Sequence, residues 1–198
     1  MTYHRTFGQG ASARTGGGAM WLGLMIAMQA AAPAPVEPLF DSATGYRVAR
    51  YRSVVPSPPH EVTAIDSDQA LHLHDRDAAL FLDVTPADGG YRDPATGNWR
   101  LAREHRTLPR ALWFPEAGRG ILSDPIGRWF FRGVQVHAKG RPIVVFCLSD
   151  CWMSWNAAMR LQRMGYADVR WFADGVDGWR ERRWPMIAAA PVAGAIGE

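Results

Sequence analysis

From residue 61 onward, short apolar runs alternate with longer stretches in which apolar residues recur at helical spacing. Several runs are apolar at consecutive positions, which is typical of strands covered on both faces in a parallel sheet. The alternation of strand and helix predicts an α/β sandwich. The predicted strands are 61–65, 80–84, 111–114, 142–147 and 168–172.

The stretches between these strands predict three helices. The first spans 67–76 with Ser67 as its N-cap, because a serine side chain can accept a hydrogen bond from the first turn. The second spans 124–138 and has Pro125 in its first turn, a position that tolerates the missing N–H of proline. The third spans about 153–164 and is followed by a glycine, a common helix terminator.

Three segments lack such periodicity. Residues 33–60 are rich in proline and predict an extended lead-in before a domain over 61–190. Residues 85–110 form a long polar insertion within this domain, and loops of that length often carry function or cover a site. Residues 191–198 predict a flexible tail.

The N-terminal segment has the composition of a secretory signal. Residues 1–18 contain two Arg and no acidic residue, 19–28 are apolar, and small residues follow before Pro33. We therefore predict a signal peptide over 1–32. The apolar run is shorter than the roughly 20 residues that span a bilayer, so we expect no membrane span after cleavage, with an uncleaved anchor as the alternative. Both interpretations place the domain outside the cytoplasm, where nearby thiols can persist as a disulfide.

Composition and charge narrow the functional classes. The chain has 198 residues, of which 47% are hydrophobic and 21% charged, and this suits one globular domain. The formal net charge is +3, but without residues 1–32 the chain has 20 basic against 19 acidic residues. Nucleic-acid binding is not expected, since it requires clustered positive charge.

The candidate chemistry lies where the most apolar strand meets the third helix. Cys147 ends this strand, and open α/β sheets place their sites at such strand ends. Backbone N–H groups and the helix dipole are expected to lower the pKa of Cys147 and to make it the nucleophile. Cys151 is four residues away, a spacing that permits a reversible disulfide with Cys147. Nothing in the sequence indicates a metal site.

Four motifs taken in order resemble a rhodanese domain over about residues 61–185. The resemblance implies a three-layer α/β sandwich with a central, mainly parallel five-stranded sheet. It also places the persulfide-bearing cysteine of that family at Cys147. The motifs are Ala-Leu-Phe-Leu-Asp-Val at 79–84, 108–115, Pro-Ile-Val-Val-Phe-Cys at 142–147, and 165–179 with its closing Gly-x-x-Gly-Trp element.

The cysteine loop is similar to that of a narrower group. Cys147-Leu-Ser-Asp-Cys151-Trp152, together with the 85–110 insertion, resembles the PQQ-dependent catabolism-associated CXXCW motif proteins, although three residues separate the cysteines here. PQQ denotes pyrroloquinoline quinone. This resemblance implies an exported, periplasmic accessory of PQQ-dependent alcohol oxidation, with a PQQ-dependent dehydrogenase or its electron acceptor as partner. The implied link to PQQ is functional, and no cofactor bound to this chain is predicted.

The loop departs from active rhodanese-family sulfurtransferases, which usually end it with an arginine. Trp152 and Met153 stand there instead, and Asp150 would repel an anionic substrate such as thiosulfate. Thiosulfate sulfurtransfer and phosphatase activity are therefore disfavoured. The arginines that could instead fold over the loop are Arg103, Arg106 and Arg110.

Supporting roles are expected for the loop residues Leu148 and Ser149 and for two side chains outside the loop. Asp83, at a strand end, could orient the loop or cap a nearby backbone turn. Trp155, with Trp152, could wall a pocket for an aromatic or quinone ligand, or pack in the core.

Three functions stay open on this sequence. The first is an enzyme that carries sulfur as a persulfide on Cys147, acting on a small sulfur-containing substrate. The second is a redox protein in which Cys147 and Cys151 cycle between dithiol and disulfide. The third is a non-catalytic binding module in which the disulfide is structural.

Overall fold

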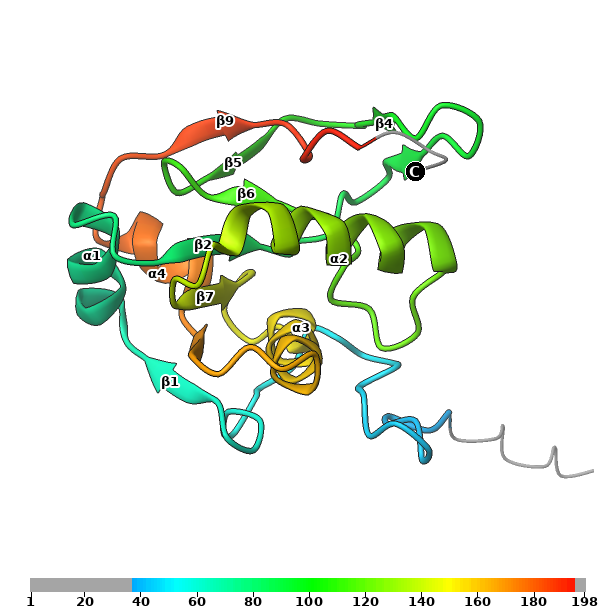
Figure 1. The fold of residues 1–198 in the computed structure, drawn as a ribbon, viewed down its shortest axis with the longest axis horizontal. Helices are drawn as coiled ribbons and strands as arrows, with labels where there is room; N and C mark the ends of the chain where they lie inside the picture. The colour runs from blue at the N-terminus through cyan, green and yellow to red at the C-terminus, as the bar shows by residue number, and fades with distance from the viewer. Residues whose placement is uncertain (1–36, 195–198) are drawn as a thin grey trace, which may run out of the picture. The chain divides into compact units, whose positions relative to one another are not determined.

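The computed structural model describes residues 37–194, which form a central five-stranded sheet with helices on both faces (Figure 1). The strand order is β1-β8-β7-β2-β6, and every neighbouring pair is parallel. All five predicted strands are confirmed, each shorter by one or two residues at an end. Their bounds are β1 Thr63–Ile65, β2 Leu80–Asp83, β6 Leu112–Trp113, β7 Ile143–Phe146 and β8 Val169–Phe172.

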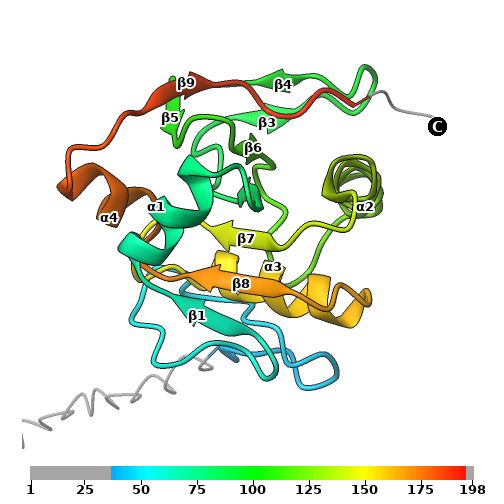
Figure 2. The ribbon, with the colours of Figure 1, turned by 60° about the vertical axis from the view of Figure 1, so that its left-hand side comes forward.

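The helices divide between the two faces of the sheet, which makes a three-layer sandwich (Figure 2). Strand β7 shows why, because alternate side chains of a strand point to opposite faces. Ile143 and Val145 pack with α2 and α3, whereas Val144 and Phe146 pack with α1 and α4. The helix bounds are α1 Ser67–Asp75, α2 Asp124–Ala138, α3 Trp152–Arg163 and α4 Gly175–Glu181.

Two helix starts differ from prediction. The N-cap of α1 is Asp66 rather than Ser67, because Asp66 forms a reciprocal capping box with Gln69. The Ser67 hydroxyl donates instead to the Asp174 carboxylate, 2.7 Å away. Helix α3 begins one residue earlier than predicted, so Cys151 becomes its N-cap.

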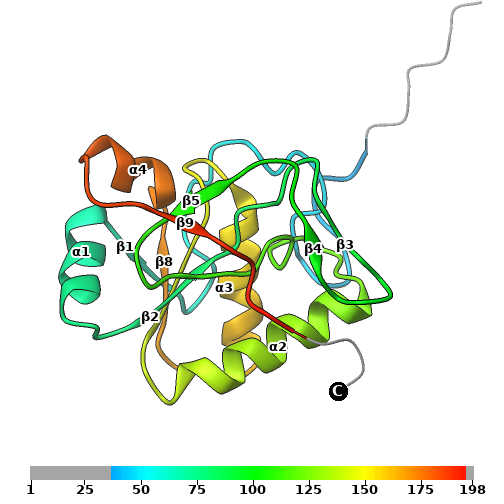
Figure 3. The ribbon, with the colours of Figure 1, turned by 90° about the horizontal axis from the view of Figure 1, so that it is seen from above.

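The insertion 85–110 contains three short strands that the sequence did not predict. Strands β3 (Tyr91–Arg92) and β4 (Trp99–Arg100) form a hairpin. Strand β5 (His105–Thr107) pairs antiparallel with β9 (Ile187–Ala189), which lies beside it in Figure 3. The insertion is therefore tied to the C-terminal part of the domain.

The segment after β9 is also held to the domain. The Val192 N–H donates to the Trp113 carbonyl at 2.9 Å, and the Trp129 indole donates to the Val192 carbonyl at 3.1 Å. Residues 191–194 of the predicted tail thus contact β6 and α2.

The predicted signal peptide, 1–32, lies outside the described residues. Within 37–194, no helix has the length and apolar character needed to cross a membrane.

Candidate thiol site

Cys147 and Cys151 lie at opposite ends of the loop between β7 and α3. Cys147 follows the last residue of β7, and Cys151 is the N-cap of α3. Both side chains are buried, with exposed fractions of 0% and 2%. The two thiols are free, and each affects the pKa of the other. The structure therefore brings together the two cysteines that the sequence singled out.

The two thiols differ in acidity, and the difference is opposite to the prediction. The neighbouring Cys147 thiol, the Met153 N–H, the charge of Arg52 and the Leu148 N–H together lower the pKa of Cys151 to about 7, against the opposing effect of burial. Burial raises the pKa of Cys147 well above its ordinary value, and the neighbouring Cys151 acts in the same direction. Cys151 is therefore the thiol that ionises first.

Burial, and not the helix start, sets the pKa of Cys147. Helix α3 begins at Trp152, and the N–H groups of its first turn act on both thiols, since the Met153 N–H lowers the pKa of Cys151 and the Ser154 N–H lowers that of Cys147. At Cys147, which is fully buried, desolvation outweighs this effect. The sulfur of Cys147 lies 3.2 Å from the Ser154 hydroxyl and 3.4 Å from the Cys151 carbonyl. The Trp171 indole donates to the same Ser154 hydroxyl at 3.0 Å and fixes it there.

Helix α4 holds the loop from one side. The Val176 N–H donates to the Cys147 carbonyl at 2.8 Å. Both the N–H and the hydroxyl of Ser149 donate to one carboxylate oxygen of Asp177, at 3.0 and 3.1 Å. Gly175 has φ +52°, and a Cβ there would lie 1.9 Å from the Cys147 carbonyl oxygen. This approach requires a glycine.

The lead-in segment holds the loop from the other side. Arg52 forms an antiparallel bridge with Cys151, and the Ser53 N–H donates to the carbonyl of Asp150 at 2.9 Å. Asp150 itself is exposed and has φ +49°. The Trp152 N–H donates to the Tyr51 carbonyl at 2.8 Å. Residues 51–53 thus lie along the loop as an added strand-like segment.

The cation that acts on the thiols comes from the lead-in, since the charge of Arg52 favours the thiolate of Cys151. Of the predicted arginines, Arg106 and Arg110 donate elsewhere, to the carbonyls of Met186 and His74. Arg103 lines a small cavity that the loop residue Leu148 also lines. The adjacent pair Tyr51-Arg52 is the sequence signal for the lead-in contact, but no periodicity connects it to a loop 100 residues away.

The two tryptophans after Cys151 pack against the lead-in. The Trp152 indole donates to the Ser53 hydroxyl at 2.9 Å, and the Arg47 guanidinium lies 4.8 Å from the centre of its ring. The Trp155 indole donates to the Ser57 carbonyl at 3.0 Å. The side chain of Met153, which completes the first turn of α3, is buried. These rings serve packing, the second of the two roles considered for them.

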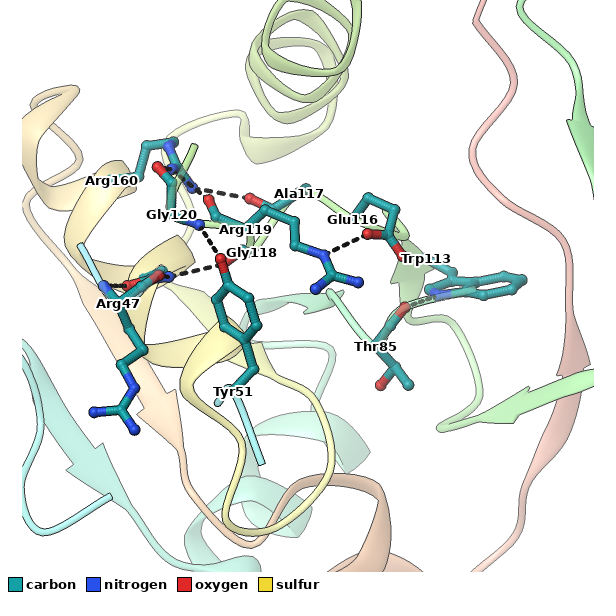
Figure 4. A network of polar contacts seen from close by, with 11 residues as sticks. Arg47, Tyr51, Thr85, Trp113, Glu116, Ala117, Gly118, Arg119, Gly120 and Arg160 are labelled. Atoms are coloured by element: carbon teal, nitrogen blue, oxygen red, sulfur yellow. Dashed lines mark hydrogen bonds and ion pairs between the residues drawn. The ribbon is translucent and has the colours of Figure 1, made fainter. Parts of the chain in front are cut away.

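A network of polar contacts fixes the lead-in over α3 (Figure 4). The Asn156 side chain accepts from the Arg47 N–H at 2.9 Å and donates to the Arg47 carbonyl at 2.8 Å. The Arg160 guanidinium donates to three carbonyl oxygens of residues 117–120 at 2.8 to 3.2 Å. The Tyr51 hydroxyl accepts an N–H from the same segment at 3.0 Å. The lead-in is thus hydrogen-bonded to α3 at Arg47 and to the 117–120 segment at Tyr51.

Asp83 does not contact the cysteine loop through its side chain. One of its oxygens accepts from the Thr85 N–H at 2.8 Å, which caps a turn. The other accepts from the Thr107 hydroxyl at 2.6 Å and lies 2.7 Å from the His105 imidazole. Asp83 therefore anchors β5, and the capping role is the one found.

Leu148 faces the insertion. It lines a cavity of about 170 Å³ together with His105 and Trp113, whose rings lie 4.2 Å apart. Among residues 37–194, no group of three or more His, Cys, Asp or Glu side chains is placed to hold a metal ion.

Fold and site together define an α/β domain with paired thiols at the carboxyl end of a central parallel strand. The family model of the rhodanese-like domain matches residues 66–182. The chain therefore belongs to the rhodanese-like domain family.

The solved structures to which this chain is similar include two sulfur transferases. A thiosulfate sulfurtransferase from Pseudomonas aeruginosa is 15% identical, with a TM-score of 0.46, over 69% of this chain and 22% of that chain. A structure of EanB with ergothioneine is 25% identical, with a TM-score of 0.45, over 64% and 28% of the two chains. The polysulfide-sulfur transferase of Wolinella succinogenes is 15% identical, with a TM-score of 0.43, over 64% and 79%.

The aligned part is thus less than a third of the length of the first two of these chains. No curated protein matches the sequence.

Proposed function

We propose that this rhodanese-like protein carries out thiol–disulfide exchange, with Cys151 as the attacking thiolate and Cys147 as the second thiol. The observation that carries the proposal is the pair of free, buried thiols at the two ends of one loop, in which the pKa of Cys151 is about 7. A thiol with a pKa near the ambient pH combines a useful thiolate fraction with good nucleophilicity.

The exchange proceeds in two balanced steps, with a disulfide on a substrate or partner as the oxidant. The Cys151 thiolate attacks one sulfur of that disulfide, forms a mixed disulfide and releases the other sulfur as a thiolate. Cys147 then loses its proton and attacks the Cys151 sulfur. The Cys147–Cys151 disulfide forms, and the second partner sulfur leaves as a thiolate.

Access to Cys151 requires the lead-in to move. Its thiol is 2% exposed, and residues 51–53 lie across it. Because Arg52 is an exposed side chain whose charge favours the thiolate, a partner that binds this segment would alter both the access to Cys151 and its acidity. The lead-in is therefore the part of the site where a partner would act.

Persulfide carriage is the second candidate, because the chain belongs to the rhodanese-like family and Cys147 occupies the family's persulfide position by resemblance. It would leave a bound sulfur that cyanide removes as thiocyanate. The burial of Cys147 and its raised pKa favour exchange through Cys151 instead.

For the biological setting we propose an exported accessory of PQQ-dependent alcohol catabolism. Its support is the resemblance of the Cys147–Trp152 loop to the CXXCW motif proteins and the signal-like composition of residues 1–32. The partner would be a periplasmic PQQ-dependent dehydrogenase or its electron acceptor.

The reaction with dipyridyl disulfide tests the chemistry, because thiopyridone release is followed by absorbance. The wild type should release two equivalents near neutral pH. Cys147→Ser should stop after one, at the mixed disulfide, and Cys151→Ser should react at least about tenfold more slowly. Rapid reaction of Cys151→Ser with an inert Cys147→Ser would assign the nucleophile to Cys147 and overturn the proposal.

Two further results would favour the other functions. If both thiols of the folded protein are inert and react only in denaturant, the protein is a binding module. If cyanide releases thiocyanate from a sample treated with a sulfur donor, and Cys147→Ser abolishes that release, the persulfide route holds.

A further inference from the structure

A second cavity lies away from the thiol site, beside helix α2. It has a volume of about 540 Å³, within the range of small-molecule sites. The β3–β4 hairpin and the C-terminal segment 192–194 form its other walls, and Figure 2 shows both beside α2. No step of the proposed thiol chemistry uses this cavity.

The lining of this cavity is cationic. Arg92 comes from the hairpin, and Arg128 and Arg132 come from α2, four residues apart and therefore on one stripe of the helix. His137 lines it too, and no Asp or Glu does so among the described residues. Asp93 lies between the lining residues Arg92 and Pro94, and its carboxylate accepts from the N–H groups of Ala95 and Thr96. Asp124 is highly exposed and lies 3.9 Å from Arg128. Its effect is screened by water.

Arg92 is the most constrained of these cations. Its Nε is buried and has no hydrogen-bond partner among residues 37–194, and its NH2 donates to the Gly194 carbonyl at 3.3 Å. Burial also lowers the pKa of Arg92. A buried donor without a partner is costly.

The remaining wall is apolar and aromatic. Trp129 lies on the floor, 7% exposed, with the Arg92 guanidinium 5.7 Å from its ring centre. Pro94, Val136 and Val192 add aliphatic surface. A strongly hydrated inorganic ion would gain nothing from such walls, whereas an organic body would.

We propose that this cavity binds a small aromatic polycarboxylate, with Arg92, Arg128 and Arg132 holding its carboxylates and Trp129 contacting its ring. Arginine suits the role because its planar guanidinium pairs with a carboxylate through two parallel hydrogen bonds. Three separate cations around one apolar floor match several carboxylates on one rigid ring.

Isothermal titration of the full chain with trimesate, a benzenetricarboxylate, tests the proposal. Trimesate should bind, benzenetricarboxamide should not, and citrate and inorganic phosphate should bind more weakly because they lack the ring. Added salt should weaken the trimesate affinity. Failure of trimesate to bind, or equal affinity for phosphate and trimesate, would overturn the proposal.

Two double variants assign any binding to this cavity. Arg128→Gln with Arg132→Gln removes two exposed side chains from α2, so the fold should be kept, and the Kd should rise about tenfold or more. The matched control is Arg76→Gln with Arg183→Gln, which removes the same charge from exposed positions elsewhere and should leave the Kd within about twofold. Equal losses in the two variants would show general charge attraction and would refute the site.

Neither result depends on the thiols. A chain with Cys147→Ser and Cys151→Ser should bind trimesate as the wild type does. The two proposals can therefore fail separately.

Discussion

Asp83 and Cys147 stand at the carboxyl ends of neighbouring strands, yet the two strand ends have opposite characters. Asp83 closes β2 opposite Phe146, the last residue of β7, and both Asp83 and Cys147 are fully buried. The carboxylate of Asp83 meets three partners, the Thr85 N–H, the Thr107 hydroxyl and the His105 ring. Such a group is fixed in place.

The thiol end is held through its backbone instead. The carbonyl of Cys147 accepts from Val176, while its sulfur meets the Ser154 hydroxyl and the carbonyls of Leu148 and Cys151. Sulfur forms only weak hydrogen bonds, so the two thiols can change their protonation or bonding without breaking the backbone hydrogen bonds that hold the loop. The carboxyl end of β2 therefore supports the insertion, whereas the carboxyl end of β7 holds two reactive sulfur atoms within a fixed backbone.

The largest expected effect tests the contact between α4 and the cysteine loop. Gly175→Ala would place a Cβ 1.9 Å from the Cys147 carbonyl oxygen at a position with φ +52°, so α4 and the loop must separate. We expect a loss of about 4 kcal/mol or more in the free energy of unfolding, measured by urea denaturation. Gly140→Ala is the control, since it has φ +74° but open space, and should cost about 1 kcal/mol. Similar losses at both positions would mean that backbone strain alone matters and that the loop is not held by α4.

The next effect tests the β2 end. Asp83→Ala leaves the Thr107 hydroxyl, the His105 ring and the Thr85 N–H without their acceptor, and should cost about 3 kcal/mol in urea denaturation. Asp88→Ala, on the exposed surface of the insertion, should change stability by less than about 0.5 kcal/mol. The thiolate absorbance titration of Cys151 should stay unchanged in both variants. A shifted titration in Asp83→Ala would show that Asp83 and the thiols are coupled, and would contradict their separate roles.

The sequence was sufficient for the sheet because burial on both faces leaves a strong local signal. The run from Ile143 to Phe146 has no polar residue, and all four side chains are buried. The sequence was also sufficient for α2, whose predicted bounds 124–138 are those observed. Family membership also followed from motifs of residues close in sequence, whereas the predicted disulfide is not formed, because both cysteines are free.

What the sequence could not provide depends on contacts between distant segments. The pairing of β5 with β9 joins residues about 80 positions apart, and each strand has only three residues, too few for a recognisable pattern. The contact of Arg52 with Cys151 is similar. The pKa order of the two cysteines depends on the full burial of Cys147 and on the charge of Arg52 at Cys151, and neither can be seen in the local sequence pattern.

The smallest expected effect is a change of stability with pH that comes from the thiols and not from Asp83. The pKa of Cys151 is lowered from 9.0 to about 7 in the folded protein, so between these values the unfolded chain binds more protons than the folded one. Stability should therefore rise with pH across this window, by about 2 kcal/mol at most for a shift of this size. The raised pKa of Cys147 works the other way, because above pH 9.0 the unfolded chain loses a proton that the folded one keeps. Stability should then fall again.

Urea denaturation at a series of pH values measures this curve, and the difference between the wild type and Cys151→Ser isolates the thiol from the histidines that titrate in the same range. Asp83→Ala, although less stable throughout, should keep the rise between pH 7 and 9, because Asp83 makes no side-chain contact with the thiols and a carboxyl group in the unfolded chain is ionised over this whole interval. If Cys151→Ser shows the same rise as the wild type, the low pKa does not belong to Cys151. The assignment of Cys151 as the more acidic thiol would then be wrong. The order of the two attacks would be wrong with it, since the thiol that ionises first begins the exchange.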